Sequence, residues 1–301
     1  MDNKLKAIID LGSLKAKMTV FDTQTFDVVL QKSYLTLLGK SMSEDGLIIE
    51  EAFSRLNEAL LNIKNELENL GCEDLKFIAT ESLRLAKNKE EVFKLVEKYF
   101  SGQTVTILDQ SLEGEMFFRV VSRCFIDQPI VTMDVGGGSV QILLGSFNGK
   151  QDQHLIDNKY LYKTGTYKLQ QKYSPDNSII SHDFEKVFFD IHEEFRSLNV
   201  TNDVLVFGST CMQDFLEEAG VALYNDRPAK KHPSYTTVSD LKKLLTDIRQ
   251  YPPDSRNHFY PRGEYFIYGA DYLLANVIEA AESLNAKYIY PTNMNSSYGF
   301  I

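Results

Sequence analysis

The sequence predicts an α/β protein of two domains. Two segments, residues 7–22 and 130–145, share one pattern: an apolar strand that ends in Asp, a turn that contains glycine, and a second apolar strand. This pattern is typical of a β-hairpin. The length of 301 residues suits two domains of about 100–150 residues each. We expect the first domain over residues 1–126 and the second over 127–301, with the last residues able to pack back on the first domain.

The first half alternates strands and helices after its opening hairpin. Between Glu50 and Leu70, apolar residues recur every three or four positions, which predicts an amphipathic helix that ends at Gly71. The other expected elements are strands near 5–10, 17–22, 27–33, 75–79 and 104–108, and helices at about 89–100 and 111–124. The resulting order, βββαβαβα, is one half of a duplicated architecture.

The second half repeats the hairpin from Ile130 and adds a turn at Asn148 and Gly149. Two stretches rich in proline and polar residues, 225–234 and 251–263, are predicted as surface loops. The remaining expected elements are helices near 165–173, 183–198 and 264–284, a strand at 203–207 that leads into Gly-Ser-Thr at 208–210, and a strand at 286–290.

The paired turns point to phosphate. When Asp10 is aligned with Asp134, Gly12 falls on Gly136 and Lys17 on Gln141. Glycines let the backbone approach an anion and direct N–H groups at it, and an Asp at a strand end can hold a divalent cation or its water. Two facing copies would clamp a phosphoryl group from both sides. An ordinary tight turn explains either copy alone, but explains the pair poorly.

Composition restricts the function classes. The net charge of −10 opposes nonspecific binding of nucleic acid or anionic membranes. No apolar run approaches the roughly 18 residues of a membrane span, and the N-terminus lacks a signal-peptide pattern, so we expect a cytoplasmic protein. Cys72, Cys124 and Cys211 lack metal-ligand spacing and are expected to be buried, reduced thiols. A polyanionic substrate would need a local basic lining, for which the candidates are Lys15, Lys17, Arg84, Arg119, Arg123, Lys163, Lys168, Lys172, Arg227, Lys230 and Lys231.

Five motifs resemble those of one family. Residues 10–17 (DLGSLKAK) correspond to its DxGSNSxR, and residues 79–88 (ATESLRLAKN) to its ATSAxRxAxN, with Ala, Thr, Arg, Ala and Asn in register. Residues 112–114 (LEG) correspond to Glu-Glu-Ala, 134–141 (DVGGGSVQ) to DIGGGSTE, and 206–210 (VFGST) to GxGGT. The chain thus resembles the exopolyphosphatase/guanosine pentaphosphate phosphatase (Ppx/GppA) family in its short, two-domain form.

That family lies in the superfamily of acetate and sugar kinases, heat-shock chaperones and actin. The resemblance implies two actin-like, ribonuclease H-like domains with an interdomain cleft. It implies hydrolysis of a terminal phosphoanhydride, either of inorganic polyphosphate or at the 5′ end of guanosine pentaphosphate, usually with Mg²⁺. It also suggests a homodimer.

The resemblance assigns roles to individual residues. Glu113 would be the general base that orients the attacking water, Arg84 would grip the terminal phosphate, and Asp134 completes the catalytic set. Asp10 and Asp134 would hold the metal or its water. Without the resemblance, Arg84 would be an exposed arginine at a helix start and Glu113 an acid near a helix N-terminus. The predicted phosphate-binding residues are Gly12, Ser13, Lys15, Lys17, Thr80, Gly136, Gly137, Gly138, Ser139, Gly208, Ser209 and Thr210.

The departures from the family pattern leave alternatives open. Leu14 and Lys15 replace Asn and Ser, Leu112 and Gln141 each replace an acidic residue, and Val206 and Ser209 each replace a glycine. One hypothesis is an active phosphoanhydride hydrolase, exopolyphosphatase-like or acting on guanosine pentaphosphate. The other is a weakly catalytic or noncatalytic sensor that binds polyphosphate or a guanosine polyphosphate. A sugar or acyl kinase is disfavoured, because the stretch at 79–88 belongs to the phosphatase branch.

Overall fold

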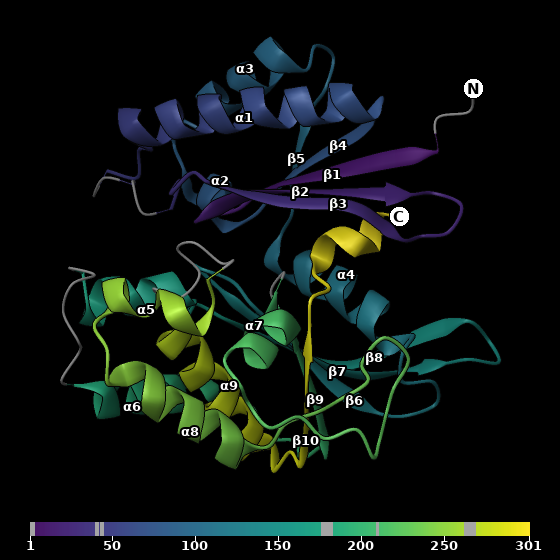
Figure 1. The fold of residues 1–301 in the computed structure, drawn as a ribbon, viewed down its shortest axis with the longest axis vertical. Helices are drawn as coiled ribbons and strands as arrows, with labels where there is room; N and C mark the ends of the chain where they lie inside the picture. The colour runs from purple at the N-terminus through teal and green to yellow at the C-terminus, as the bar shows by residue number, and fades with distance from the viewer. Residues whose placement is uncertain (1–3, 40–41, 43–44, 176–182, 209–210, 262–268) are drawn as a thin grey trace. The chain divides into compact units, whose positions relative to one another are not determined.

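The structure, a computed structural model, describes residues 4–39, 42, 45–175, 183–208, 211–261 and 269–301 (Figure 1). The chain forms two compact units. Unit 1 comprises Met1–Glu113 and Ser297–Ile301, and unit 2 comprises Gly114–Ser296. Helix α4 (Gln110–Ser122) runs across this division. The domain boundary expected after residue 126 stays a prediction.

Unit 1 is built on a mixed sheet. Its strand order is β3-β2-β1-β4-β5, in which β1, β2 and β3 pair antiparallel while β1, β4 and β5 pair parallel. Helix α1 contacts β2, β3 and α3. The strands are β1 (Leu5–Leu11), β2 (Lys15–Asp22), β3 (Val28–Leu35), β4 (Asp74–Ala79) and β5 (Val105–Ile107), and the helices are α1 (Glu50–Leu70), α2 (Glu81–Leu85) and α3 (Glu90–Tyr99).

The two faces of this sheet bury different sets of residues. The apolar stripe of α1, which includes Leu56, Leu60 and Ile63, joins the core cluster formed with β1, β2 and β4. The stripe ends as predicted at Gly71, whose φ of 64° is the left-handed conformation that favours glycine at a helix end. A separate buried cluster contains Ile8, Phe21, Ile78 and Leu108, and against it pack the last residues of the chain, Tyr298, Phe300 and Ile301.

Unit 2 repeats the plan. Its sheet has the order β10-β9-β6-β7-β8, with β6, β7 and β8 antiparallel and β6, β9 and β10 parallel. The strands are β6 (Ile130–Val135), β7 (Val140–Asn148), β8 (Gln153–Tyr162), β9 (Val204–Gly208) and β10 (Tyr288–Thr292). The helices are α5 (Thr166–Tyr173), α6 (Phe184–Phe195), α7 (Met212–Glu218), α8 (Val238–Arg249) and α9 (Ala270–Leu284), with short 3₁₀ turns η1 (Pro253–Ser255), η2 (Asn257–Phe259) and η4 (Ser296–Phe300).

The matching strand orders confirm the predicted fold class. In each unit, three antiparallel strands in sequence are extended on the side of the first strand by two parallel strands, each reached through helical segments. This is the arrangement of an actin-like, ribonuclease H-like domain, and the chain contains it twice. Parallel strands need such crossover connections, which are usually helical.

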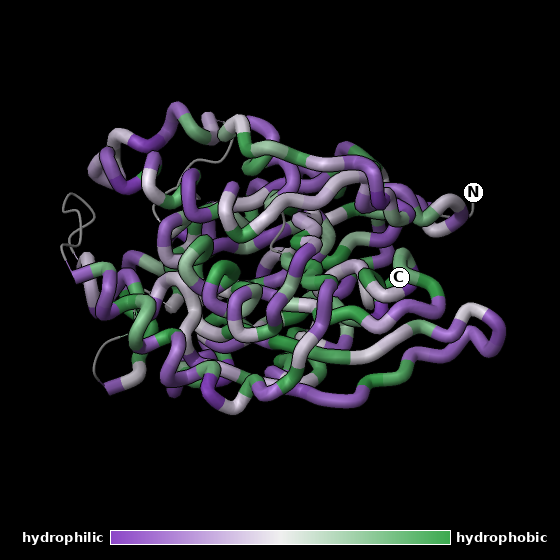
Figure 2. The backbone as a smooth tube through the Cα atoms, turned by 90° about the horizontal axis from the view of Figure 1, so that it is seen from below, coloured by the Kyte–Doolittle hydropathy of each residue, from purple (hydrophilic) through white to green (hydrophobic). Residues whose placement is uncertain are grey.

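Helix α9 forms the centre of the unit 2 core. Its residues from Ala270 to Ala281 are buried, and both α6 and α8 pack on it. A helix that is buried nearly all round must be apolar on most faces, and α9 supplies mostly Ala, Leu, Ile and Val. Figure 2 shows hydrophobic and hydrophilic segments alternating along the chain. Within the described part of the chain, no helix is long and apolar enough to cross a membrane.

Several predicted boundaries differ from the structure. The helix expected at 264–284 is α9, which begins at Ala270, while 264–268 lie outside the described residues. The strand expected at 286–290 is β10, Tyr288–Thr292. This strand includes Pro291, a residue that suggests a strand end. Because β10 lies at the sheet edge and the isolated bridge on its outer side joins Thr236 to Ile289, the missing N–H of Pro291 is tolerated.

Three helices were not predicted. Helices α2 and α7 have only five and seven residues, too few to show a helical period. Helix α8 was detectable: Thr237 accepts a hydrogen bond from the Asp240 backbone N–H, an N-cap, and Leu241, Leu244, Leu245 and Ile248 form a helical stripe. It was not predicted because it lies between two proline-rich stretches, 225–234 and 251–263, that were assigned to surface loops.

Candidate phosphate-binding turns

The two predicted turns close in the same way. In unit 1, the Gly12 N–H donates to the Lys15 carbonyl across 3.0 Å. In unit 2, the Gly136 N–H donates to the Ser139 carbonyl across 2.9 Å. A methyl group on either glycine would lie 3.0 or 3.1 Å from the carbonyl oxygen that closes its own turn. The alignment made from sequence therefore corresponds to one backbone geometry used twice.

Asp10 is a buried carboxylate at the end of β1. Its side chain belongs to a residue only 5% exposed, and its Oδ1 has no hydrogen-bond partner. Burial raises the pKa of Asp10, and the charge of Lys17, which lies opposite on β2, partly offsets that rise. A buried carboxylate oxygen without a hydrogen-bond partner costs folding free energy. Such an oxygen suits a site where it would contact a bound cation or a water molecule held by that cation.

The first turn is held by the segment that follows β3. The N–H groups of Thr36 and Leu37 donate to the Leu14 carbonyl, and the Gly39 N–H donates to the Ser13 carbonyl at 2.7 Å. A methyl group on Gly39 would lie 2.7 Å from the Ser13 Cβ. Gly39 thus permits close packing on the turn, a role that the sequence analysis missed.

Arg84 and Glu113 come together within unit 1. Arg84 Nη1 lies 3.2 Å from Glu113 Oε2 and also donates to the Leu108 carbonyl. The side chains are 19% and 12% exposed. Thr80, which precedes α2, is 7% exposed. Asp109 caps α4 by accepting from the Leu112 N–H, which fixes the first turn of the helix that carries Glu113. Neither Arg84 nor Glu113 is a solvated surface charge.

Asn88, the last residue of the second motif, has a structural role. Its side-chain amide donates to the Ile48 carbonyl and accepts from the Ile48 N–H, both at 2.9 Å. Such a pair of bonds satisfies the backbone of a loop residue. It anchors the segment before α1 next to α2, the helix that carries Arg84.

The second turn is supported by the start of α5. The N–H groups of Thr166 and Tyr167 donate to the carbonyls of Gly136 and Gly137, at 3.0 and 2.8 Å. A methyl group on Gly165 would lie 2.2 Å from the Gly138 carbonyl carbon and 2.4 Å from the Ser139 nitrogen. Gly165 is therefore the counterpart of Gly39. The carbonyls of Gly136 and Gly137 are thus directed at α5.

Asp134 and Gln141 lie opposite each other on β6 and β7. Asp134 is 8% exposed and Gln141 1% exposed. The Gln141 Nε2 donates to the Ser139 Oγ at 2.9 Å. Where unit 1 places a cation opposite its strand-end Asp, unit 2 places a neutral amide.

Gly208 has a packing explanation. It ends β9 beside Asp134, and a methyl group there would lie 2.6 Å from the Phe117 ring and 2.9 Å from the Met294 carbonyl oxygen. Ser209 and Thr210 lie outside the described residues. Close backbone approach by a ligand at Gly208 stays a prediction.

Several candidates for a basic lining are engaged with acids. Arg123 lies 3.0 Å from Asp152, and Lys172 is paired with Asp190. Arg119 is within 3.9 Å of Glu115. Arg227, Lys230 and Lys231 are exposed in the loop before α8, where the Arg227 guanidinium lies over the Tyr288 ring. These contacts suit solvated surfaces.

The cysteines differ in burial from the expectation. Cys72 is buried, but Cys124 and Cys211 are only half-buried. Burial raises the pKa of the Cys72 thiol to about 11, with Asp74 adding to the rise. All three positions fall within the described residues, and none forms a disulfide.

The described residues contain no group of three or more His, Cys, Asp or Glu side chains suited to hold a metal ion. A single carboxylate per turn still fits Mg²⁺, which is commonly bound through one or two carboxylates together with substrate phosphates and water. The unpartnered Oδ1 of Asp10 fits such a role.

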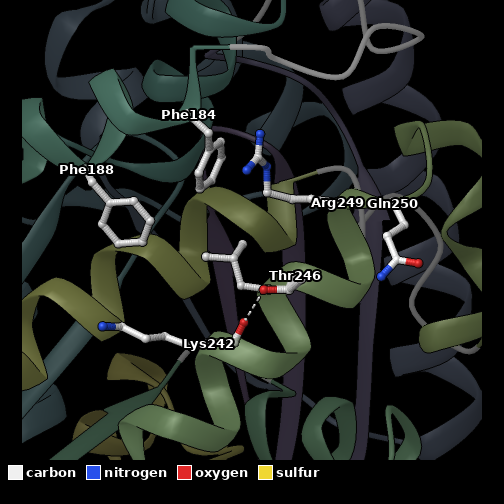
Figure 3. A pocket seen from close by; sticks show the side chains of 7 residues that line it. Phe184, Phe188, Lys242, Thr246, Arg249 and Gln250 are labelled. Atoms are coloured by element: carbon white, nitrogen blue, oxygen red, sulfur yellow. Dashed lines mark hydrogen bonds between the residues drawn. The ribbon is translucent and has the colours of Figure 1, made fainter.

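A pocket of about 410 Å³ lies between α6 and α8 in unit 2 (Figure 3). Its walls include the rings of Phe184 and Phe188, and the Arg249 guanidinium stacks over Phe184 at 4.0 Å. None of the residues predicted for phosphate chemistry lines it. The pocket is therefore separate from both turns.

The sheet topology and the repeated hairpin define a protein of two actin-like units. The profile of the Ppx/GppA phosphatase family matches residues 19–258. The chain belongs to this family, which confirms the resemblance seen in the motifs.

Individual relatives agree with this assignment. The chain is 24% identical over 303 residues to a bifunctional 3-dehydroquinate synthase/phosphatase of Fusobacterium nucleatum, covering 92% of the chain and 44% of that protein. It is 30% identical over 147 residues to a guanosine-5′-triphosphate,3′-diphosphate pyrophosphatase of Pseudoalteromonas translucida, covering 46% of the chain and 28% of that protein. The chain thus spans less than half the length of both relatives. The crystal structure of a Ppx/GppA family member from Aquifex aeolicus superposes with a TM-score of 0.75 at 19% identity, covering 98% of this chain and 95% of the other.

Proposed function

We propose that the protein hydrolyses the terminal phosphoanhydride bond of inorganic polyphosphate, with Glu113 as general base. The observation that carries this proposal is the Arg84–Glu113 pair, in which a nearly buried guanidinium and a nearly buried carboxylate lie 3.2 Å apart. A phosphate grip and a base for water are the two groups that the reaction requires from side chains.

Arg84 is arranged to bind phosphate while it holds Glu113. Both of its hydrogen bonds, to Leu108 and Glu113, use Nη1. The Nε and Nη2 groups keep their N–H donors, which can form two parallel bonds to one phosphate group. Arg84 would then fix the terminal phosphate relative to the base.

In the reaction, a water oxygen attacks the terminal phosphorus and its proton passes to the Glu113 carboxylate. The bridging P–O bond breaks, inorganic phosphate is released, and the shortened chain leaves with the bridging oxygen. The turn N–H groups of Gly137 and Gly138, together with Lys15 and Lys17, would neutralise phosphate oxygens. Asp10 and Asp134 would hold Mg²⁺, which when bound offsets charge that develops on those oxygens.

Two alternative functions are each favoured by one observation. Guanosine pentaphosphate presents the same terminal anhydride, and the name of the Pseudoalteromonas relative favours a guanosine polyphosphate substrate. A sensor that binds polyphosphate without turnover is favoured by Gln141, a neutral residue where the family pattern has an acid. The family's homodimer and its magnesium also stay predictions for this chain.

The test is release of inorganic phosphate by Glu113→Gln, with Glu115→Gln as the matched control. Both residues lie on α4, and Glu115 contacts Lys159 and Arg119 instead of Arg84. We expect Glu113→Gln to bind polyphosphate nearly as wild type while turnover falls by roughly 10²-fold or more, as for loss of a general base. The control should keep wild-type turnover. Unchanged turnover in Glu113→Gln would remove this residue from the mechanism.

A further inference from the structure

The hydroxyl of Ser139 is held by a single buried neighbour. Ser139 is 4% exposed and Gln141 1% exposed, and the Gln141 Nε2 donates to the Ser139 Oγ across 2.9 Å. The two residues stand two positions apart at the start of β7, at the edge of the second turn. Their geometry is therefore set by the same hairpin that forms the turn.

The Gln141 side chain is confined by α4. A methyl group on Gly114 would lie 2.9 Å from the Gln141 Cβ and 2.7 Å from the Leu143 Cδ1. The family motif has Ala at position 114, so the chain departs from the pattern at two residues that are in contact, Gly114 and Gln141. Glycine at 114 therefore lets α4 pack closely against the side chain at 141.

The direction of this hydrogen bond decides what Ser139 can offer a ligand. A hydroxyl has one proton and can both donate and accept. Because the amide N–H of Gln141 is the donor, Ser139 accepts through its oxygen and keeps its own proton. We propose that Gln141 is a positioning residue that makes Ser139 a hydrogen-bond donor to a phosphate oxygen in the second turn. The proposal rests on the proposed phosphate chemistry of this turn.

A carboxylate at position 141 would reverse the arrangement. It can only accept, so the Ser139 proton would turn toward it and the oxygen lone pairs would face the ligand. It would also add a buried negative charge opposite Asp134, which repels phosphate and attracts a cation. Gln141 therefore biases the second turn toward direct binding of phosphate and away from binding through a metal.

The test is a double-mutant cycle of tripolyphosphate binding, measured by calorimetry with a chelator present. We expect Ser139→Ala to weaken binding about 10-fold, since a hydrogen bond to a charged group is lost. Gln141→Glu should weaken it at least as much, and adding Ser139→Ala to Gln141→Glu should weaken it little further. In phosphate-release assays, Gln141→Glu should lower the Mg²⁺ concentration needed for half-maximal rate.

Two further variants keep the cycle decisive. Gln31→Glu is the matched control, because Gln31 also donates to a hydroxyl, that of Thr19, on the unit 1 sheet. Gln141→Met removes the donor without adding charge and should weaken binding less than Gln141→Glu.

Additive losses from Ser139→Ala and Gln141→Glu would overturn the proposal, as would absence of tripolyphosphate binding to the wild type without metal. Binding that follows the expected cycle in a protein that releases no phosphate would refute the hydrolase and leave the Ser139 assignment in place.

Discussion

The turn at Gly12 and the turn at Gly136 have the same backbone but different chemistry. Each is closed by a hydrogen bond from its first glycine to the residue three positions later, at 3.0 and 2.9 Å. The first turn carries Lys15 and lies beside Lys17, while the second carries three glycines and Ser139 and lies beside Gln141. The two hairpins therefore share a backbone and differ in the side chains at and beside the turn.

This difference teaches that the two hairpins carry different groups. The first has the side chains of Lys15 and Lys17 at or beside its turn, and the second has glycines, Ser139 and Gln141. If both turns bind phosphate as proposed, the first would attract a polyanion at long range through its charge. The second would act through backbone and hydroxyl donors, which need direct contact.

The largest expected effect on stability and activity comes from Gly165, which packs on the second turn, and it differs in kind from that of Gly39 on the first turn. Gly165→Ala should lower the unfolding temperature and abolish phosphate release, because the methyl group meets turn backbone at 2.2 and 2.4 Å and such overpacking costs about 1–3 kcal/mol. Gly39→Ala meets the Ser13 side chain, so Ser13→Gly should rescue it. Calorimetric unfolding of Gly165→Ala, Gly39→Ala and the double variant Gly39→Ala/Ser13→Gly checks this prediction. If Ser13→Gly did not restore the unfolding temperature, Gly39, like Gly165, would be required by contacts with backbone.

The strand-end carboxylates give the next effect. Burial raises the pKa of Asp10, so its ionised form destabilises the fold above that pKa and the penalty vanishes in acid. Asp10→Asn should therefore raise the unfolding temperature at pH 7 by a few degrees, roughly 1 kcal/mol, while cutting phosphate release about 10²-fold. The gain in stability should shrink as pH falls. Lower stability at pH 7 would indicate that Asp10 caps the turn and has no ligand role.

Exchange of the cross-strand residue makes the first hairpin resemble the second. Lys17→Gln removes the cation opposite Asp10 and should raise the KM for polyphosphate about 10-fold at low salt, with a weaker dependence on salt concentration. Lys6→Gln, the same change on β1 of the same sheet, serves as control. Equal effects of the two variants would show that only net charge matters.

The last prediction concerns the pH dependence of stability and involves no residue of either turn. All five histidines fall between residues 154 and 258, within the sequence range of unit 2. Burial lowers the pKa of His232 from 6.5 to about 4, so the folded state loses stability as pH falls from 6.5 toward 4 and the unfolded chain takes up the proton. His232→Phe, which keeps a ring against Phe125, should flatten this pH dependence by a few kcal/mol. Identical slopes for variant and wild type would contradict the assignment.

Much of the fold was predictable because it depends on local pattern. The hairpins alternate apolar strands with glycine turns, and α1 has a clear helical period that ends at Gly71. What the sequence could not reveal are contacts between distant segments: Gly39 on Ser13, Gly114 on Gln141, and Asn88 on the Ile48 backbone. No local periodicity encodes such pairs.

The candidate site shows the same limit. Motifs located Asp10, Arg84 and Glu113, but only the structure shows that Arg84 contacts Glu113 and that an Asp10 oxygen is buried without a partner. From sequence, Gln141 is only a neutral residue where the family pattern has an acid. The structure shows that its side-chain amide donates a hydrogen bond to the Ser139 Oγ.

The most direct test of the account is phosphate release by the wild-type protein from long-chain polyphosphate and, separately, from guanosine pentaphosphate, each with magnesium and with chelator. The account predicts magnesium-dependent release, faster from polyphosphate. Tight binding of either polyanion with no release under any condition would contradict the hydrolase and establish a sensor.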